Sequence, residues 1–334
     1  MAAPTRMRAE IAEIPEAIAR LVDGAPTEAL AAAAEALRRR DPVAILTIGR
    51  GSSDHAATYL KYAIEITAGR PVASIGPSVA SVFGAQLRVD AMAALAISQS
   101  GTSADIVALA GALRQAGADV FALTNSVESP LARTAHHPVD IVAGPERAVA
   151  ATKSFVSSIV AGLRVLALWT GEAALERALC RLPTRVEAAL AVEWGDVGAA
   201  MAEAQSLMIL ARGPALGLAA EAALKTMETC GVHASAYSAA EILHGPSTLL
   251  TDGFPVLVLG RGSVPKDGLG PTLERLEAQG AKVILPPSPG PTEHPLTDPL
   301  LEIARFYALI EAEARRRGRN PDEPAFLRKE TSTV

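Results

Sequence analysis

Three ionisable side chains in one short stretch form the group best suited to proton transfer. Glu221, Lys225 and Glu228 have the spacing that places side chains on one face of an α-helix. The rest of the stretch 219–229 is largely apolar, so this face could lie against protein. A partly buried carboxylate beside an ammonium group has a perturbed pKa suited to moving a proton. A solvent-facing row of salt bridges has the same spacing, and the residues alone leave both interpretations open.

A polar loop between an apolar run and a helical pattern predicts an anion-binding site. The apolar run 93–97 stops at a segment of hydroxyl residues with one Gln and one Gly: Ser98, Gln99, Ser100, Gly101, Thr102 and Ser103. Free N–H groups and the helix dipole favour negative charge at a helix N-terminus. Phosphate is therefore the first ligand to consider. Serines are also ordinary helix N-caps, so the loop alone does not distinguish an anion-binding site from a simple helix start.

A second serine-containing loop, 49–53, follows the first apolar run of the chain. Gly51 permits a close backbone approach, and Ser52 or Ser53 can cap the following helix and donate to an anion. In doubly wound sheets, ligands bind beyond the carboxyl ends of the strands, where both loops are expected to lie. Together they predict a shared phosphate site, although a plain strand–helix turn has the same composition.

Two further residues are candidates because of their positions. His244 is expected where a short helix ends against Gly245 and Pro246, and imidazole titrates near neutral pH. A histidine at a helix end is also often structural. The segment 320–331 is polar, which is typical of a disordered end. Its prolines and the apolar pair 326–327 could anchor it and hold Lys329 over a site.

Composition excludes several classes of protein. Hydrophobic residues make up 49% of the 334 residues, enough for two globular domains. The net charge of −5 disfavours nucleic acid, since the one basic cluster, 315–317, is expected to be a solvated helix end. Cys180 and Cys230 lack metal-ligand spacing and predict no disulfide. No signal peptide or membrane span is evident, so we expect a cytoplasmic protein without a membrane partner.

Short apolar runs that alternate with helical patterns predict a parallel sheet covered on both faces. Strands are expected at 42–48, 71–75, 93–98, 119–123 and 139–143. Helices are expected at 7–23, interrupted or restarted at Pro15, and at 27–40, 53–68, 104–115, 153–169 and 172–204. The predicted fold class is α/β with doubly wound, flavodoxin-like sheets.

The pattern then begins again. The runs 207–213, 255–259 and 279–283 repeat 45–51, 94–98 and 116–120 at an offset of roughly 162 residues, which predicts tandem domains. We expect an N-terminal helical segment 1–30, a phosphate-binding domain 31–175, a domain with acid–base residues 195–318, and a tail 319–334 over the active site. The second copy has 213–215 in place of the serines, so only one copy is predicted to keep the phosphate site.

These motifs, taken in order, resemble the sugar isomerase (SIS) proteins. The resemblance is closest to the isomerase half of glutamine–fructose-6-phosphate aminotransferase and to type II glucosamine-6-phosphate deaminases. It runs almost end to end and rests on the segments 10–15, 51–53, 98–101, 146–153, 221–228, 241–246 and 324–329. It implies two tandem SIS domains of three-layer α/β/α architecture.

The resemblance also implies how the substrate is held. In this family, the phosphate of a hexose 6-phosphate is bound by residues that match Ser53, Ser98, Gln99, Ser100 and Ser103. The position of Ser103 is usually Thr, a change that keeps the hydroxyl. The predicted phosphate site also includes Gly51 and Ser52. The main chain around Val149 and Ala150 is implied to contact the sugar.

Four residues are implied to carry the chemistry. The residue matching Glu228 moves a proton between C1 and C2, and Lys225 would orient or polarise the substrate. The residue matching His244 opens the sugar ring and comes from the neighbouring subunit, which implies a homodimer. Lys329 matches a tail lysine that forms a Schiff base with fructose 6-phosphate in the synthase.

Departures from the family pattern favour a deaminase over a synthase. We expect no glutaminase domain, because its N-terminal nucleophilic Cys has no match in this sequence. Val82 stands where the synthase usually has Glu, and Met227 replaces a common Lys. Glu228 and His244 are both kept. We therefore expect conversion of glucosamine 6-phosphate to fructose 6-phosphate and ammonia, with no cofactor and no metal.

Other functions fit the same residues. Galactosamine-phosphate deamination, deglycation of a fructosamine phosphate, and glutamine-independent synthesis of glucosamine 6-phosphate all use the same phosphate and C1–C2 unit. A sugar-phosphate sensor is the alternative that is not an enzyme. The retention of Glu228, His244 and Lys329, without a helix-turn-helix pattern, argues against a sensor.

Overall fold

The computed structural model describes residues 4–24, 26–261, 269–288 and 290–329. The chain forms two compact units, each assembled from separate pieces of sequence. The five-stranded unit comprises Ile14–Glu146, Lys153–Pro183 and Arg328–Val334, and the four-stranded unit comprises Met1–Glu13, Arg147–Thr152 and Thr184–Leu327. We describe each unit by itself.

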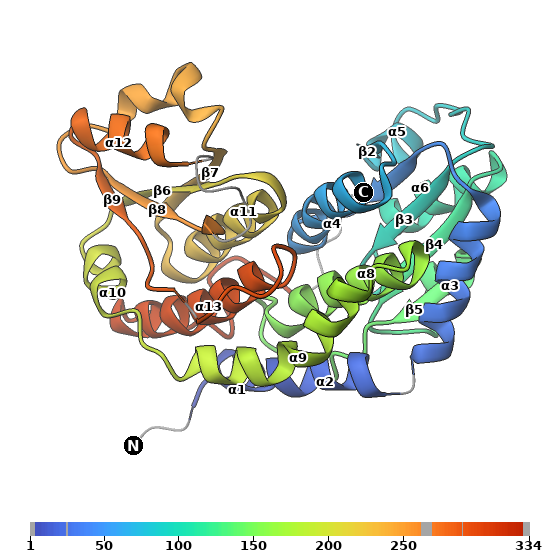
Figure 1. The fold of residues 1–334 in the computed structure, drawn as a ribbon, viewed down its shortest axis with the longest axis horizontal. Helices are drawn as coiled ribbons and strands as arrows, with labels where there is room; N and C mark the ends of the chain where they lie inside the picture. The colour runs from blue at the N-terminus through green and yellow to red at the C-terminus, as the bar shows by residue number, and fades with distance from the viewer. Residues whose placement is uncertain (1–3, 25, 262–268, 289, 330–334) are drawn as a thin grey trace. The chain divides into compact units, whose positions relative to one another are not determined.

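The five-stranded unit is built on a parallel sheet with the strand order β2-β1-β3-β4-β5 (Figure 1). Its strands are β1 (Ile45–Ile48), β2 (Val72–Ser74), β3 (Ala93–Ile97), β4 (Asp119–Thr124) and β5 (His137–Asp140). The central strands β1, β3 and β4 are nearly continuous apolar runs, as expected for strands that are buried on both faces, whereas the edge strands β2 and β5 are partly exposed.

Helices alternate with these strands, as the sequence predicts. They are α2 (Ile14–Asp23), α3 (Thr27–Arg40), α4 (Ser52–Ala68), α5 (Ser78–Ser81), α6 (Ala104–Gln115), α7 (Pro130–Thr134), α8 (Lys153–Thr170) and α9 (Ala173–Leu190). The α9 helix crosses the boundary of the unit at Pro183. Within the described residues, only α8 has the length and composition that could cross a membrane, and 78% of it is buried in the protein.

The four-stranded unit contains a second parallel sheet, with the order β7-β6-β8-β9. Its strands are β6 (Ser206–Ala211), β7 (His233–Ser238), β8 (Pro255–Val258) and β9 (Lys282–Ile284). Its α-helices are α1 (Arg6–Ala12), α10 (Gly195–Ala202), α11 (Leu216–Lys225), α12 (Gly270–Ala278) and α13 (Asp298–Arg316). Shorter helices are η1 (Gly213–Ala215), η2 (Thr226–Cys230), η3 (Ile242–His244) and η4 (Pro246–Leu249).

The two sheets agree in strand order and in register. When the strands of each sheet are counted in chain order, the second lies at one edge and is followed by the first, the third and the fourth. Leu46 pairs with Ala94 in one sheet, and Met208 pairs with Val256 in the other. These paired positions are separated by the same offset that relates the repeated runs of the sequence.

The first predicted helix, 7–23, is two helices in the structure. The α1 helix ends at Ala12 and α2 begins at Ile14, so Pro15 lies in the first turn of α2. Proline is tolerated there because the first turn leaves its N–H groups without intrahelical partners. The predicted helix 172–204 is likewise divided into α9 and α10.

The basic cluster 315–317 is more than a solvated helix end. The Arg317 guanidinium donates to the carbonyls of Met201 and Ala204, both at 2.9 Å, where α10 ends. The same side chain pairs with the buried carboxylate of Glu313. Burial would raise the pKa of Glu313, but hydrogen bonds from Arg316 and Arg317 outweigh it and lower the pKa.

Candidate functional site

The loop after β3 is shaped by its own hydroxyl groups. The buried Ser98 Oγ accepts a hydrogen bond from the Gly101 amide at 3.2 Å, and Ser100 Oγ lies 2.7 Å from Thr102 Oγ1. Gly101 has a φ of +64°, and a Cβ there would lie 2.1 Å from Ser129 Oγ. Only glycine fits this position, which allows the loop to turn tightly before α6.

The predicted anion-binding residues lie around the start of α6. Ser103 is the N-cap residue, yet its side chain makes no capping hydrogen bond. Gln99 and Ser100 are half-buried. The carbonyl of Gln99 accepts the Asn125 amide at 3.0 Å, which ties the loop to the end of β4. This arrangement places hydroxyl groups beside a helix N-terminus, the environment that favours an anion.

The loop after β1 forms a tight strand–helix turn. A Cβ on Gly49 would lie 2.7 Å from the Asp54 amide nitrogen, and Gly51 has a φ of +52°. Ser52 and Ser53 are the first residues of α4, and both are half-buried. Because β1 and β3 are parallel neighbours, this loop and the Ser98 loop leave the same edge of the sheet.

An ion pair between the loop after β1 and the start of α6 was not predicted from the sequence. Arg50 Nη2 lies 2.9 Å from Asp105 Oδ2, which joins the first loop to the first turn of α6. The Asp105 side chain is 2% exposed, whereas that of Arg50 is 47% exposed. The one sequence feature that could have pointed to this ion pair is the position of Arg50 between two glycines in a loop at the end of a strand.

The acid–base row of the four-stranded unit is buried, so the interpretation as a solvent-facing stripe is wrong. The Glu221 and Lys225 side chains are 0% and 1% exposed, and that of Glu228 is 20% exposed. Lys225 Nζ lies 3.6 Å from Glu221 Oε1 and also forms an ion pair with Glu228. Tyr307 of α13 donates from its hydroxyl to Glu221 Oε1 at 3.2 Å. Lys225 is therefore held between two carboxylates, of which Glu228 is the more accessible.

Glu228 lies where the helix widens. The α11 helix ends at Lys225 and continues as the π-helix η2, which closes at Gly231 with a φ of +61°. L side chains rarely adopt this left-handed conformation, so the turn favours glycine. Short π-helical segments inside α-helices are frequent at functional sites.

His244 is the last residue of the 3₁₀-helix η3, as the sequence predicts. The chain turns there at Gly245, which has a φ of +140°. The imidazole is exposed on the four-stranded unit. An exposed side chain at this position is accessible to a molecule outside the unit.

The segment that carries Val149 and Ala150 belongs to the four-stranded unit. The Val149 amide donates to the carbonyl of Asp322 at 2.9 Å, which leaves this N–H committed to the C-terminal tail. Val149 is half-buried and Ala150 is buried. A ligand at this segment would therefore have to be bound by groups other than the Val149 amide.

Lys329 is placed by a buried carboxylate. Its Nζ lies 3.2 Å from Glu146 Oε2, and both residues belong to the five-stranded unit. Glu146 also accepts hydrogen bonds from the amide and the hydroxyl of Ser154, at 3.1 and 2.5 Å. The tail lysine is thus ordered by an ion pair in the structure.

The paired histidines of the five-stranded unit have structural partners and form no candidate site. His136 and His137 both lie against Asp119, at 3.2 and 3.1 Å. The Val120 amide donates to His136 Nδ1 at 3.0 Å, and burial lowers the pKa of His136. Among the described residues, no group of three His, Cys, Asp or Glu residues is arranged to hold a metal ion.

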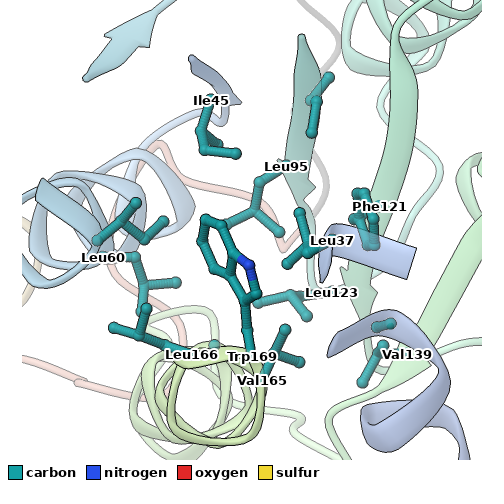
Figure 2. Close-up of a pocket in the computed structure, with 15 residues that line it drawn as sticks. Leu37, Ile45, Leu60, Leu95, Phe121, Leu123, Val139, Val165, Leu166 and Trp169 are labelled. Atoms are coloured by element: carbon teal, nitrogen blue, oxygen red, sulfur yellow. The ribbon is translucent and has the colours of Figure 1, made fainter. Parts of the chain in front are cut away.

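A small apolar cavity lies inside the five-stranded unit (Figure 2). Its volume is about 40 Å³, and its walls come from the sheet and from α3, α4 and α8. Figure 2 shows the Trp169 indole among Leu37, Leu95 and Leu123. The cavity has no polar side chain suited to catalysis, so we treat it as a packing feature of the core.

Comparisons with known proteins place the chain in a family. Residues 39–167 match the SIS domain. A crystal structure of a proposed phosphosugar isomerase from Silicibacter pomeroyi DSS-3 is 47% identical, covers 96% of this chain and 100% of that chain, and has a TM-score of 0.90. The chain belongs to the SIS family.

Curated relatives extend the comparison. A glutamine–fructose-6-phosphate aminotransferase (isomerizing) from Sulfurisphaera tokodaii is 31% identical over 99% of this chain and 57% of the relative. The chain thus spans about half the length of the curated relatives it matches. A glucosamine-6-phosphate deaminase from Thermotoga maritima is 19% identical over 98% of this chain and 100% of that chain, with a TM-score of 0.78, and shares the fold.

Proposed function

We propose that this protein is a phosphosugar isomerase whose proton-transfer group is Glu228. The observation that carries the proposal is the buried row of Glu221, Lys225 and Glu228 in a chain of the SIS family. A carboxylate next to a buried ammonium group, and itself still accessible, can remove a proton from a bound substrate and return it. A protein that only binds sugar phosphates has no need for such a group.

The specific reaction that we propose is the conversion of glucosamine 6-phosphate and water to fructose 6-phosphate and ammonia. His244 would move the proton from the anomeric hydroxyl to the ring oxygen and open the ring. Glu228 would take the proton from C2 and return it to C1, while a second proton passes from the C2 amine to the C1 oxygen, which converts the aldose into a ketose imine. Water then adds to the imine carbon and ammonia leaves, so no oxidant or reductant is needed.

The proposal assigns the phosphate to the two loops of the five-stranded unit. Their hydroxyl groups, the start of α6 and the half-exposed Arg50 support a dianionic ligand there. Binding energy from a remote phosphate can position the reacting carbons, because it is spent on orientation rather than on chemistry. Lys225 would polarise the substrate, and Lys329 would cover it or form a transient imine with a keto sugar.

We also propose that the chain contains two tandem SIS domains that arose by duplication. Matching strand order and register in the two sheets support this history. The second sheet has Gly213–Ala215 where the first has Ser52 and Ser53, so only one copy would bind phosphate. The exposed imidazole of His244 supports a homodimer in which this residue serves the neighbouring subunit.

Ammonia release from glucosamine 6-phosphate tests the proposed function. We expect the purified chain to release ammonia and to form fructose 6-phosphate in equal amounts, and Glu228→Gln to abolish both. Release no greater than that of Glu228→Gln would refute the deaminase. A panel with galactosamine 6-phosphate and fructosamine 6-phosphate, analysed for products, would identify the sugar. Tight binding of every member without turnover would instead favour a sensor.

A further inference from the structure

The first helix of the chain is capped by a residue from the C-terminal tail. The amides of Arg6 and Met7 donate to the two carboxylate oxygens of Asp322, at 2.9 and 2.8 Å. These N–H groups are in the first turn of α1 and have no partner inside the helix. The helix dipole adds to the attraction for a carboxylate at this end. Asp322 therefore fastens the tail to α1.

The same helix also holds the segment of Val149 and Ala150. Glu10 is 5% exposed, and its Oε1 accepts hydrogen bonds from the amides of Arg147 and Ala148. Hydrogen bonds to an ionised acceptor are stronger than those between neutral groups. A buried glutamate of α1 thus fixes the main chain immediately before Val149.

These contacts close into a loop of three segments. The tail is bonded to α1 through Asp322, α1 is bonded to Arg147 and Ala148 through Glu10, and the Val149 amide is bonded to the Asp322 carbonyl. The α1 helix is itself anchored to α13, where Thr5 Oγ1 donates to Glu311 Oε1 at 2.8 Å. All of these residues belong to the four-stranded unit.

We propose that Glu10 and Asp322 are positioning residues, which hold the sugar-contacting segment and the tail in the geometry that the reaction requires. This inference rests on the proposed function, together with the sugar contact that the family resemblance implies for the main chain around Val149 and Ala150. Neither carboxylate has to touch substrate. Each acts through main-chain groups, and a small displacement of such groups has a large effect on the rate.

Paired substitutions at Glu10 separate positioning from simple stability. Glu10→Gln keeps one oxygen acceptor for the Arg147 and Ala148 amides, whereas Glu10→Ala removes both oxygens. We expect Glu10→Ala to speed hydrogen exchange at these amides and to lower kcat/KM for glucosamine 6-phosphate by about tenfold, mainly through KM. Glu10→Gln should stay within about twofold of the wild type, because it keeps the acceptor.

Asp322→Asn is the second variant. If Glu10→Ala does not fold, this variant still distinguishes a positioning role from a purely structural one. It puts an amide donor against one of the two N–H groups of α1, so it should release the tail and raise KM in the same way. Glu16→Gln is the control, because its side chain is 73% exposed and pairs only with Arg20 among the ion pairs of the described residues.

The outcomes distinguish the inference from the function on which it rests. Faster exchange together with a raised KM in Glu10→Ala or Asp322→Asn, with Glu10→Gln and Glu16→Gln unchanged, supports positioning. A lower melting temperature with unchanged KM and kcat would overturn it and leave a structural role. A wild-type chain that neither binds nor converts amino-sugar phosphates would overturn the proposed function, and the inference with it.

Discussion

Arg50 and Asp105 join the loop after β1 to the first turn of α6 in the five-stranded unit. The Arg50 guanidinium approaches Asp105 Oδ2 through Nε at 3.0 Å and through Nη2 at 2.9 Å. The other oxygen, Oδ1, accepts the Ile106 amide at 2.8 Å. A buried carboxylate thus fixes the loop after β1 against the start of α6, and the half-exposed guanidinium leaves positive charge at the edge where phosphate is expected.

Arg50→Met should weaken both the fold and the anion site. It leaves the Asp105 carboxylate buried without its cation, so the free energy of unfolding should fall by on the order of 2 kcal/mol. Affinity for inorganic phosphate should fall several-fold as well, as measured by calorimetry. Arg88→Met, at an exposed arginine of the same unit, is the control. Phosphate affinity equal to that of the wild type would show that Arg50 has no part in the anion site.

Lys225→Met should abolish activity, since it takes the cation from between two carboxylates. The buried Glu221 then loses its charge partner, at a cost of about 3 kcal/mol of stability. Tyr307→Phe is the matched comparison, because it removes only the hydroxyl group bonded to Glu221. We expect it to cost about 1 kcal/mol and to leave kcat within about twofold. A similar loss of kcat in both variants would contradict a direct role for Lys225.

Glu302 of α13 gives stability a pH dependence that can be measured. Burial raises the pKa of Glu302 to about 7, although the hydrogen bond from the Gly260 amide opposes this shift. Because the folded state binds the proton more tightly, stability falls as the pH rises from the unfolded pKa towards 7, and it stays low above that value.

Glu302→Gln should remove this dependence. We expect the variant to match the wild type near pH 4 and to exceed it by on the order of 1–3 kcal/mol at about pH 8. Urea unfolding at both pH values tests this, with Glu274→Gln on the exposed side of α12 as the control. A wild-type protein with equal stability at both pH values, and a Glu302→Gln variant no more stable at the higher one, would disprove the assignment.

Complementation tests whether His244 acts in the neighbouring subunit. His244→Ala and Glu228→Gln should each be inactive alone. If the histidine is donated across a two-fold interface, mixed dimers regain one intact site, so coexpression should restore about a quarter of the wild-type activity. A coexpressed mixture as inactive as its components would place both residues in the same chain's site.

Two glycines should respond to alanine in opposite ways. A Cβ on Gly162 meets only the flexible end of Leu60, at 2.4 Å, and both residues line the small apolar cavity into which Leu60 can turn. Since alanine also favours a helix interior, Gly162→Ala should raise stability by up to about 1 kcal/mol. Gly231→Ala should lower it by about 1 kcal/mol, because φ is +61° there and an L side chain is strained in that conformation. Thermal unfolding measures the stability of both variants. A lower melting temperature for Gly162→Ala would show that Leu60 does not turn into the cavity to make room for the new methyl group.

Local sequence patterns predicted most of the fold. The helices 27–40 and 104–115 have the predicted bounds, and the parallel sheet follows from the alternation of apolar runs and helices. The last strand of the first sheet was predicted at 139–143 but lies at His137–Asp140. The apolar run 139–143 continues past the paired residues, and Val142, with a φ of +40°, cannot continue a strand.

Part of the candidate site lies beyond sequence reasoning. Helical spacing placed Glu221, Lys225 and Glu228 on one face, but their burial depends on α13, which is distant in sequence. The π-helical turn at Glu228 has no pattern of its own. The contacts of Arg50, Glu10 and Asp322 join residues far apart in the chain, and no local periodicity reports such pairs.

The fastening of α1 by Asp322 affects how the protein is made. The helix leaves the ribosome long before the residue that caps it, because Asp322 is 316 positions from Arg6. During synthesis α1 therefore has to wait for Asp322, while the segments 14–146 and 153–183 can form their sheet first. The four-stranded unit should be completed only after residue 322 has emerged, and a nascent chain stalled before that residue should carry a folded first sheet beside an unprotected α1.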